Sequence, residues 1–267
     1  MKREPAVAYQ FYPGDPATLR HSLDNLIPST TVKQKALAVV SPHAGYIYSG
    51  PVAGETFAAV EIPRDIVVIG PNHHGYGAPV ALMQKGAWSM PLGEVPINTL
   101  LAQTLLTQTD LIEDDTLAHR FEHSLEVQVP FLQYFRPDMT LTPMVISHLS
   151  FNNCQIIGKA LAAAIEQYDK PVLIVASSDM THYESREAAT AKDSLAMAQI
   201  KALDPAGLYN TVLDKGISMC GVMPTTITLI AALRLGATKA SLIRYTDSGE
   251  ASGDTKQVVG YAGFVIS

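Results

Sequence analysis

Residues 66–77 have the sequence IVVIGPNHHGYG, a short apolar run followed at once by a loop that carries two histidines. A continuous apolar run that ends at glycine and proline is typical of a strand buried on both faces of a sheet. The same arrangement occurs in residues 36–43 (ALAVVSPH) and 172–182 (VLIVASSDMTH). These runs predict three buried strands, at Ala36–Val40, Ile66–Gly70 and Val172–Ser177.

Segments with apolar residues at helical spacing separate and follow these strands. They predict helices at Pro51–Val60, Pro96–Thr107, His123–Phe135, Cys154–Tyr168, Arg186–Leu203, Asp204–Lys215 and Pro224–Leu235. In the third of these helices Pro130 should produce a kink or a break, because proline removes a hydrogen bond from a helix interior. Three more strands are predicted at Leu141–Ile146, Ser241–Thr246 and Val258–Val265, and the last two are candidates for an antiparallel pair.

Apolar strands that alternate with helices favour an α/β fold, in which helices cover both faces of a mostly parallel sheet. The 267 residues contain no repeat, low-complexity tract or linker, and 18 Gly and 17 Pro are spread along them. We therefore expect one domain that spans residues 1–267.

Composition and charge indicate which kinds of partner and which cellular compartment to expect. The formal net charge is −6 and the sequence has no basic run, so a nucleic-acid partner is not expected. The N-terminus lacks the apolar core of a signal peptide, and every apolar stretch is too short to span a bilayer, so we expect a cytoplasmic protein without a membrane partner. Charged residues make up only 16%, which also fits a homo-oligomer.

Two motif classes are missing from the sequence. It contains neither of the glycine-rich phosphate-binding patterns, G-x-G-x-x-G after a strand or G-x-x-x-x-G-K-[ST]. It also lacks the G-x-S-x-G elbow that carries the nucleophile of α/β-hydrolases. Nucleotide-binding and serine-hydrolase functions are therefore not expected.

Four of the eight histidines follow a predicted buried strand, namely His43, His73, His74 and His182. Because ligands of open α/β sheets bind at the carboxyl ends of the strands, these loops should converge on one edge. A single histidine at such a position is more often a hydrogen-bonded structural residue, but three strand ends with histidine favour a site. Imidazole suits iron, copper, zinc and nickel.

The two cysteines, Cys154 and Cys220, are too few for a disulfide scaffold. Cys220 precedes the proline that opens the predicted helix at Pro224, and a thiol near a helix N-terminus has a lowered pKa and binds metals as thiolate. The alternative for Cys220 is a small buried apolar side chain, the usual state of a free cysteine. Cys154 has no histidine near it in sequence and is predicted to be structural.

Two further pairs have three-residue spacing. The carboxylate of Asp179 can orient the imidazole of His182, or both can face a substrate; a helix-capping aspartate beside an unrelated histidine is an equal alternative. His123 and Glu126 would share a helix face, as a second metal pair, as residues that hydrogen-bond the metal ligands, or as a surface ion pair. We favour contact with the ligands or the substrate. The remaining histidines are predicted to be structural or surface residues: His21, His119 and His148.

As a set, these motifs resemble the Memo family, whose bacterial and archaeal members are often called AmmeMemoRadiSam system protein B. The motifs are PHAGYIYSG (42–50), GPNHH (70–74), EHSLEVQVPF (122–131), SSDMTHY (177–183), the CG at 220–221 and the SGD…VGYAGF ending. The opening REPAVAYQFYPGD (3–15) is also similar, although Tyr9 stands where a glycine is common. The resemblance covers nearly the whole chain, in the right order.

The resemblance implies a three-layer α/β/α sandwich similar to the class III (LigB-type) extradiol dioxygenases, which use non-haem iron. It implies that His43, His73 and Cys220 are metal ligands, with the cysteine where the dioxygenases have a carboxylate. His182 matches a catalytic acid/base, and Asp179 and His123 match residues beside the pocket. The same motifs place four more residues around it: His74, Tyr46, Glu126 and Ser178.

The resemblance leaves more than one function open. The resemblance makes Fe(II) the first expectation, whereas the thiolate softens the site and should favour Cu(I), Zn or a more covalent iron–sulfur bond, so Cu and Zn are the alternatives. The first hypothesis is a metal-dependent, dioxygenase-like oxidoreductase in which His182 moves a proton. The alternative is a metal-, ligand- or peptide-binding protein without turnover, which acts in redox handling or partner docking; an empty scaffold is disfavoured by the retained donor set. The family name implies radical-SAM and AMMECR1-like partners, and the substrate, a small molecule or peptide, is not predicted.

Overall fold

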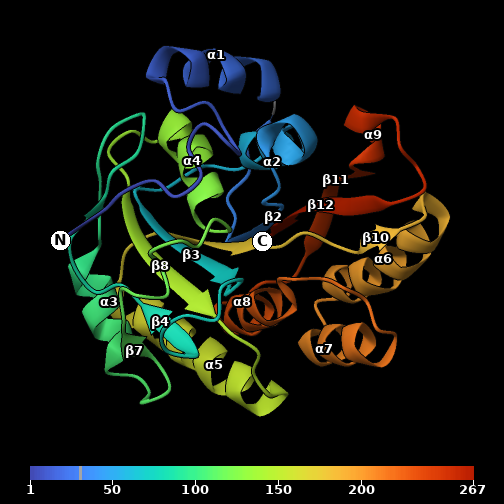
Figure 1. Cartoon of the computed structure of the whole chain (residues 1–267). Helices are drawn as coiled ribbons and strands as arrows, with labels where there is room; N and C mark the ends of the chain where they lie inside the picture. Colours follow the sequence, from blue (N-terminus) through green and yellow to red (C-terminus); the bar gives the residue numbers. More distant parts are fainter. Residues whose placement is uncertain (30–31) are drawn as a thin grey trace.

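The computed structural model describes residues 1–29 and 32–267 and is built around one large mixed sheet (Figure 1). Four parallel strands form its centre, in the order β2 (Ala38–Ser41), β9 (Val172–Ser177), β3 (Asp65–Pro71) and β8 (Thr140–Ile146). Antiparallel strands extend one side: β12 (Val258–Ile266) beside β2, then β11 (Ala240–Asp247), with β10 (His182–Glu184) at the start of β12. The other side continues with β4 (Val80–Leu82) and β7 (Glu113–Asp114).

Helices cover both faces of this sheet. In Figure 1 the upper face carries α1 (Pro16–Leu26), α2 (Tyr46–Ala58) and α4 (Val129–Phe135). The lower face carries α3 (Thr99–Leu106), α5 (Phe151–Tyr168), α6 (Arg186–Lys201), α7 (Pro205–Asp214) and α8 (Val222–Arg234), and the short α9 (Gly249–Ser252) follows β11. None of the helices in the described part of the chain combines the length and the apolar character that crossing a bilayer requires.

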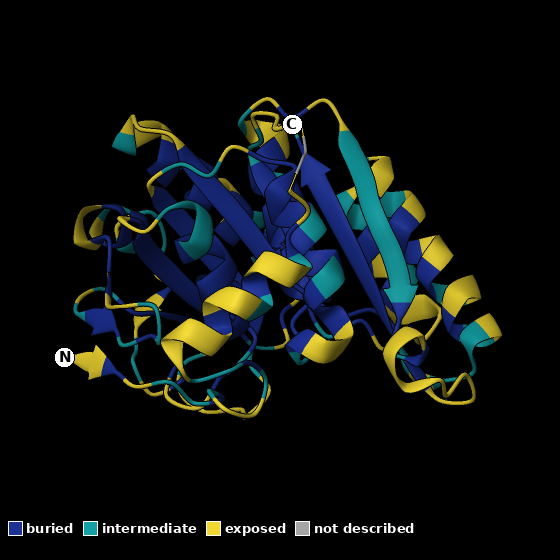
Figure 2. Ribbon diagram, turned by 90° about the horizontal axis from the view of Figure 1, so that it is seen from above, coloured by how far each residue is buried: buried dark blue, intermediate teal, exposed yellow. Residues whose placement is uncertain are grey.

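The core divides into two layers, one on each side of the sheet. In β3, Val67 and Ile69 belong to one apolar cluster, whereas Ile66 and Val68 belong to the other. This alternation is what a strand covered on both faces requires. Figure 2 shows the central strands buried and the exposed positions concentrated on the outer faces of the helices and in the loops. The predicted three-layer α/β/α sandwich with a mostly parallel centre is therefore confirmed.

The predicted strands agree with the structure to within a few residues, and Val172–Ser177 agrees at both ends. The helix predicted from Pro51 begins earlier, at Tyr46, because Gly45 is its N-cap and the proline lies inside the helix. The helix predicted from Pro96 begins later, at Thr99, because the Asn98 side chain caps it by accepting from the Leu101 N–H. Residues 95–96 instead form a strand.

The helix predicted at His123–Phe135 is wrong in its first part. Residues 123–125 are not helical; a 3₁₀ turn at Glu126–Gln128 follows them, and α4 starts at Val129. Pro130 lies in the first turn of α4, where the missing N–H removes no hydrogen bond. His123 and Glu126 therefore do not share a helix face.

The N-terminal region holds elements that sequence patterning did not predict. Helix α1 starts after Asp15, whose side chain accepts from the Thr18 N–H at 2.9 Å, and it buries Leu19 and Leu23. A small second sheet joins three short strands, β1 (Lys2–Arg3), β5 (Ala87–Trp88) and β6 (Val95–Pro96). This sheet fixes the first residues of the chain beside the main domain core.

Candidate metal centre

The loops that follow β2 and β3 bring two of the predicted histidines together, and a third imidazole joins them. The ring centroids of His43 and His73 are 5.2 Å apart, and His123 lies 5.5 Å from His43 and 4.5 Å from His73. One ring nitrogen from each of the three lies within 4.8 Å of the other two. Three imidazoles at this separation form a group that can hold a cation.

The hydrogen bonds of His43 fix which of its nitrogens is free. Its Nδ1 is 2.9 Å from the Ser177 hydroxyl, which donates its own proton to the Ser124 carbonyl at 2.6 Å and accepts from Gln128 Nε2 at 2.8 Å. Because the Ser177 hydroxyl has only one proton to donate, His43 Nδ1 is the donor toward Ser177. Burial, then the nearby His123 and His73, hold the pKa of His43 well below its usual range. His43 is therefore neutral, with the lone pair on Nε2.

A buried carboxylate fixes His73 in the same way. Glu122 Oε1 lies 2.8 Å from His73 Nδ1, and Oε2 accepts the His73 backbone N–H at 2.7 Å. Burial by itself raises the pKa of Glu122, but the N–H groups of His73 and Ser124 and the neighbouring imidazoles lower it below its usual range. Glu122 is therefore ionised and accepts from Nδ1–H, so His73 Nε2 keeps its lone pair. Carboxylate–histidine pairs of this kind orient metal ligands.

His123 stands between these two histidines and the N-terminal segment. Its ring lies 4.8 Å from Phe11, and its Nδ1 lies 3.5 Å from Glu122 Oε1. Burial is the main cause that lowers the pKa of His123 to about 4. His123 is thus a neutral donor inside the cluster. The sequence had left a metal pair with Glu126 open for His123 and favoured contact with the ligands or the substrate.

Cys220 comes next to His43 from a distant part of the chain. Its Sγ lies 3.2 Å from His43 Nε2. The Gly221 N–H donates to Ser178 Oγ at 3.1 Å, and a side chain at Gly221 would collide with the backbone of Ser177. Burial, and then the charge of Asp179, raise the pKa of the Cys220 thiol. The expected lowering by the helix N-terminus is therefore wrong for the metal-free chain, and a bound cation would be needed to favour the thiolate.

Asp179 and His182 are held by different partners. Asp179 Oδ1 accepts the His43 backbone N–H at 2.7 Å, and burial raises the pKa of Asp179 to about 6. His182 Nδ1 lies 3.0 Å from the Ser218 carbonyl, to which it donates, so Nε2 is its free nitrogen. The helix-cap alternative for Asp179 is wrong, because α6 starts at Arg186 and is capped by Ser185.

The other predicted pocket residues have structural partners. Tyr46 is buried and its hydroxyl donates to the Val127 carbonyl at 2.8 Å. Glu126 is buried and accepts from Arg3 and Tyr12, at 2.7 and 2.6 Å, so it faces the N-terminal segment.

The remaining histidines and the second cysteine lie outside the group of His43, His73 and His123, although one ring nitrogen of His74 lies within 4.8 Å of ligand atoms of Glu122 and His123. His74 is exposed on the loop after β3, with its ring 6.1 Å from that of Tyr76. His119 is buried, and His21 lies on α1 beside Asn25. Cys154 is buried in α5, where burial raises its pKa to about 11, as expected for a structural residue.

Sequence reasoning gave no role to four residues that orient the histidines of the site: Ser177, Glu122, Gln128 and Ser218. Glu122 and Gln128 lie in the EHSLEVQVPF motif and Ser177 opens SSDMTHY, whereas Ser218 lies in none of the motifs. Three imidazoles and a buried carboxylate without a Lys or Arg partner in the described residues fit a transition-metal ion, whereas Cys220 is in neither of the groups that could hold one and approaches the cluster through His43 Nε2.

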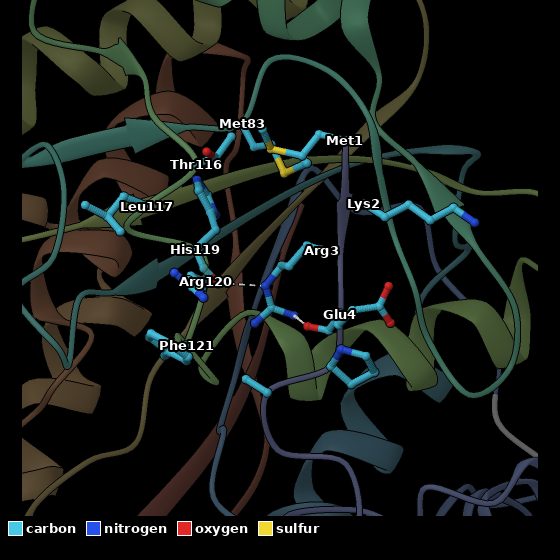
Figure 3. Close-up of a pocket in the computed structure, with 12 residues that line it drawn as sticks. Met1, Lys2, Arg3, Glu4, Met83, Thr116, Leu117, His119, Arg120 and Phe121 are labelled. Carbon is cyan, nitrogen blue, oxygen red and sulfur yellow. Dashed lines mark hydrogen bonds between the residues drawn. The ribbon is translucent and has the colours of Figure 1, made fainter.

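Two cavities lie near the cluster. One of about 260 Å³ is lined by Cys220 and by mostly apolar residues that include Ile146, Met219 and Met223. Another of about 600 Å³ separates the N-terminal segment from residues 116–121, and Figure 3 shows Arg3 reaching across it toward His119. The histidines of the cluster line neither cavity. The smaller cavity reaches Cys220 and therefore lies on the Cys220 side of the centre.

Comparison with known proteins agrees with the motifs. A family model described as "Memo-like protein" matches residues 3–265. A MEMO1 family protein of Methanopyrus kandleri is 40% identical over 100% of this chain and 99% of its own length. The MEMO1 family protein of Methanothermobacter thermautotrophicus is 39% identical over 98% of this chain and 99% of its own length. That of Aquifex aeolicus is 40% identical over 99% of this chain and 98% of its own length.

A solved structure of an uncharacterized protein from Escherichia coli K12 has the same fold class. It aligns with a TM-score of 0.60 at 16% identity, over 85% of this chain and 99% of that chain. This likeness concerns the fold alone. The family model and the full-length relatives together show that the chain belongs to the Memo family.

Proposed function

We propose that this chain binds a transition-metal ion, Fe(II) first, through His43, His73 and Cys220, and acts as a non-haem iron-dependent oxidoreductase of the dioxygenase type. The observation that carries the proposal is how the imidazoles of His43 and His73 are hydrogen-bonded. Each donates from Nδ1 to a fixed acceptor, Ser177 or Glu122, and so keeps the Nε2 lone pair for a cation. Iron bound there would supply Lewis-acid and redox chemistry.

The chain's own residues divide the remaining tasks. Asp179 holds the His43 backbone through a 2.7 Å hydrogen bond and so positions this ligand. His182, whose Nδ1–H donates to the Ser218 carbonyl, has Nε2 free to accept a proton from a bound substrate or to return one. The apolar lining of the 260 Å³ cavity beside Cys220 suits a small, mainly apolar substrate.

A second candidate function is metal or ligand binding without turnover. It is favoured by the 3.2 Å approach of Cys220 Sγ to His43 Nε2, because a paired sulfur and imidazole nitrogen suit Cu(I) and Zn. In this function the centre would handle copper or zinc, or dock a peptide, and His182 would have no proton to move.

Elemental analysis of anaerobically purified protein tests the centre. We expect stoichiometric iron in the wild type, and its loss in His43→Ala and Cys220→Ser. His123→Gln is the matched control for the third ligand position, because His123 lies in the same cluster. Retention of metal by Cys220→Ser and its loss from His123→Gln would transfer the third position to His123.

Oxygen uptake separates the two functions. With a panel of small phenolic and thiol substrates, the iron-loaded wild type should consume oxygen, and His182→Gln should bind iron equally while losing most of the uptake, since general acid–base groups contribute about 10²–10⁴-fold. Iron-loaded protein with no uptake on any substrate would leave the binding function as the better account.

A further inference from the structure

Helix α6 contacts the segment that carries His182. The helix packs against β10, the short strand that begins at this histidine (Figure 1). We propose that Asp193, a buried residue of α6, is the positioning residue that holds His182 in the orientation needed for proton transfer. This proposal rests on the proposed function, in which His182 moves the proton.

The Asp193 carboxylate joins three parts of the chain. Its Oδ1 accepts the backbone N–H of Thr181 at 2.9 Å, and its Oδ2 accepts the Tyr245 hydroxyl at 2.8 Å. Gly260 leaves room for it, because a β-carbon there would lie 2.0 Å from Asp193 Oδ2. Asp193 and Thr181 are both 0% exposed, so removal of the carboxylate would leave a buried N–H without this bond, which is costly. The contact therefore restrains the residue directly before His182.

The bonds of His182 itself depend on where this backbone lies. The Met180 N–H donates to the Gly260 carbonyl at 2.8 Å, and the Gly260 N–H donates to the Thr181 carbonyl at 2.9 Å. His182 then donates twice to Ser218, from its backbone N–H to Oγ at 2.8 Å and from Nδ1 to the carbonyl at 3.0 Å. A shift of the backbone at Thr181 would lengthen both Ser218 bonds. The second bond is the one that keeps the proton on Nδ1 and leaves Nε2 free.

The residue after His182 has a conformation that needs support. Tyr183 has a φ of 59°, in the left-handed region, and the pairing of β10 with β12 shifts register between His182 and Glu184. A residue with a side chain adopts this region at a cost in free energy, so the surrounding contacts must hold it there. Lys192, which precedes Asp193 in α6, forms an ion pair with Glu184. Two neighbouring residues of one helix thus hold the chain before and after His182, and Asp193 is the buried one.

Three substitutions separate positioning from stability. Asp193→Leu keeps the approximate shape and removes both acceptor oxygens, whereas Asp193→Asn can still accept from the Thr181 N–H while its amide donates to the Tyr245 hydroxyl. Tyr245→Phe is the matched control, because it removes a bond of Asp193 without touching Thr181. If Asp193→Leu does not fold, Asp193→Ser replaces it, since the serine oxygen is one bond nearer to the helix.

Nitrogen-15 NMR of the histidine-labelled full chain reports the tautomer of His182 at about pH 8, above the usual pKa of histidine. The signal is identified by its loss in His182→Gln. We expect the proton on Nδ1 in the wild type, Asp193→Asn and Tyr245→Phe, and a mixture of both tautomers in Asp193→Leu. Iron-loaded Asp193→Leu should contain as much iron as the wild type and lose about 10²-fold in kcat for oxygen uptake with KM unchanged, as expected when a reacting group is displaced.

A single Nδ1–H tautomer in Asp193→Leu would overturn the proposal. An equal change in Tyr245→Phe would overturn it too, because the effect would then be one of general destabilisation. If the iron-loaded wild type consumes no oxygen, the proposed function fails, but the tautomers still decide whether Asp193 positions His182. Oxygen uptake by the wild type together with an unchanged tautomer in Asp193→Leu removes the role of Asp193 alone.

Discussion

Glu122 and Glu126 lie four residues apart in one segment and are both buried, yet they face different regions of the molecule. Glu122 faces the metal centre and accepts from His73 and from backbone N–H groups. Glu126 faces the N-terminal segment, where it accepts from Arg3, Tyr12 and two backbone N–H groups. We call the second region, made of Arg3, Tyr12, His119 and Glu126, the N-terminal anchor.

The two carboxylates differ in whether a cationic side chain balances their charge. The charge of Glu126 is paired with the buried guanidinium of Arg3, which also lies 4.1 Å over the Trp88 ring. The charge of Glu122 has only histidine partners in the described residues. A compensated buried charge holds structure together, whereas an uncompensated one favours the arrival of a cation. Neighbouring residues of the same type thus serve stability in one region and chemistry in the other.

The largest expected effect is on the anchor. Arg3→Met leaves Glu126 as a buried charge without its partner, so the free energy of unfolding should fall by about 3–5 kcal/mol. Chemical denaturation of the metal-free protein measures this. The matched control is Lys2→Met, which breaks only the exposed pair with Glu94 and should change stability little. Equal effects of the two variants would mean that burial of Arg3 contributes nothing.

The next largest effect is expected on metal affinity when Glu122, the carboxylate at the metal centre, is replaced. Glu122→Gln removes the charge that orients His73, so metal affinity should fall by about 10–100-fold. The unfolding free energy of the metal-free protein should change much less than in Arg3→Met, because the substitution also removes an uncompensated buried charge. Competition against a chelator and denaturation of the same sample give both quantities. If Glu122→Gln had normal metal affinity and low stability, Glu122 would stabilise the fold as Glu126 does, and the two carboxylates would not differ in role.

The smallest effect is the acid sensitivity of the anchor. His119, whose carbonyl accepts from Arg3, is buried, and burial lowers its pKa to about 3. Its pKa in the unfolded chain is about 6.5. Because the folded value is the lower one, the contribution of His119 is complete above about pH 6.5 and is lost as pH falls toward about 3; at about pH 5 the loss is about 2 kcal/mol.

Denaturation of the metal-free wild type and His119→Gln at about pH 7.5 and about pH 5 isolates this contribution. The variant should lose about 2 kcal/mol less stability over that interval, because glutamine does not titrate. Identical losses would show that His119 is already accessible to protons in the folded state.

Local patterns in the sequence were sufficient for the layers of the fold. Three apolar runs predicted β2, β3 and β9, and the histidines after two of them predicted that His43 and His73 would converge. The sequence pattern did not predict the secondary structure correctly where a few polar contacts determine the backbone conformation. Helix α1 depends on one Asp15 cap, and residues 123–125 leave the predicted helix so that Glu122 and His123 can face the site.

By itself the sequence determined the α/β architecture and the edge at which histidines gather, because burial of apolar runs depends on residue order alone. The tertiary structure decided the partners: Ser177 for His43, Glu122 for His73, Arg3 for Glu126, and a sulfur 177 residues away beside an imidazole. The physical reason is that a buried polar atom must find its hydrogen bonds among whatever the packed chain brings within about 3 Å, and spacing along the chain does not record that neighbourhood.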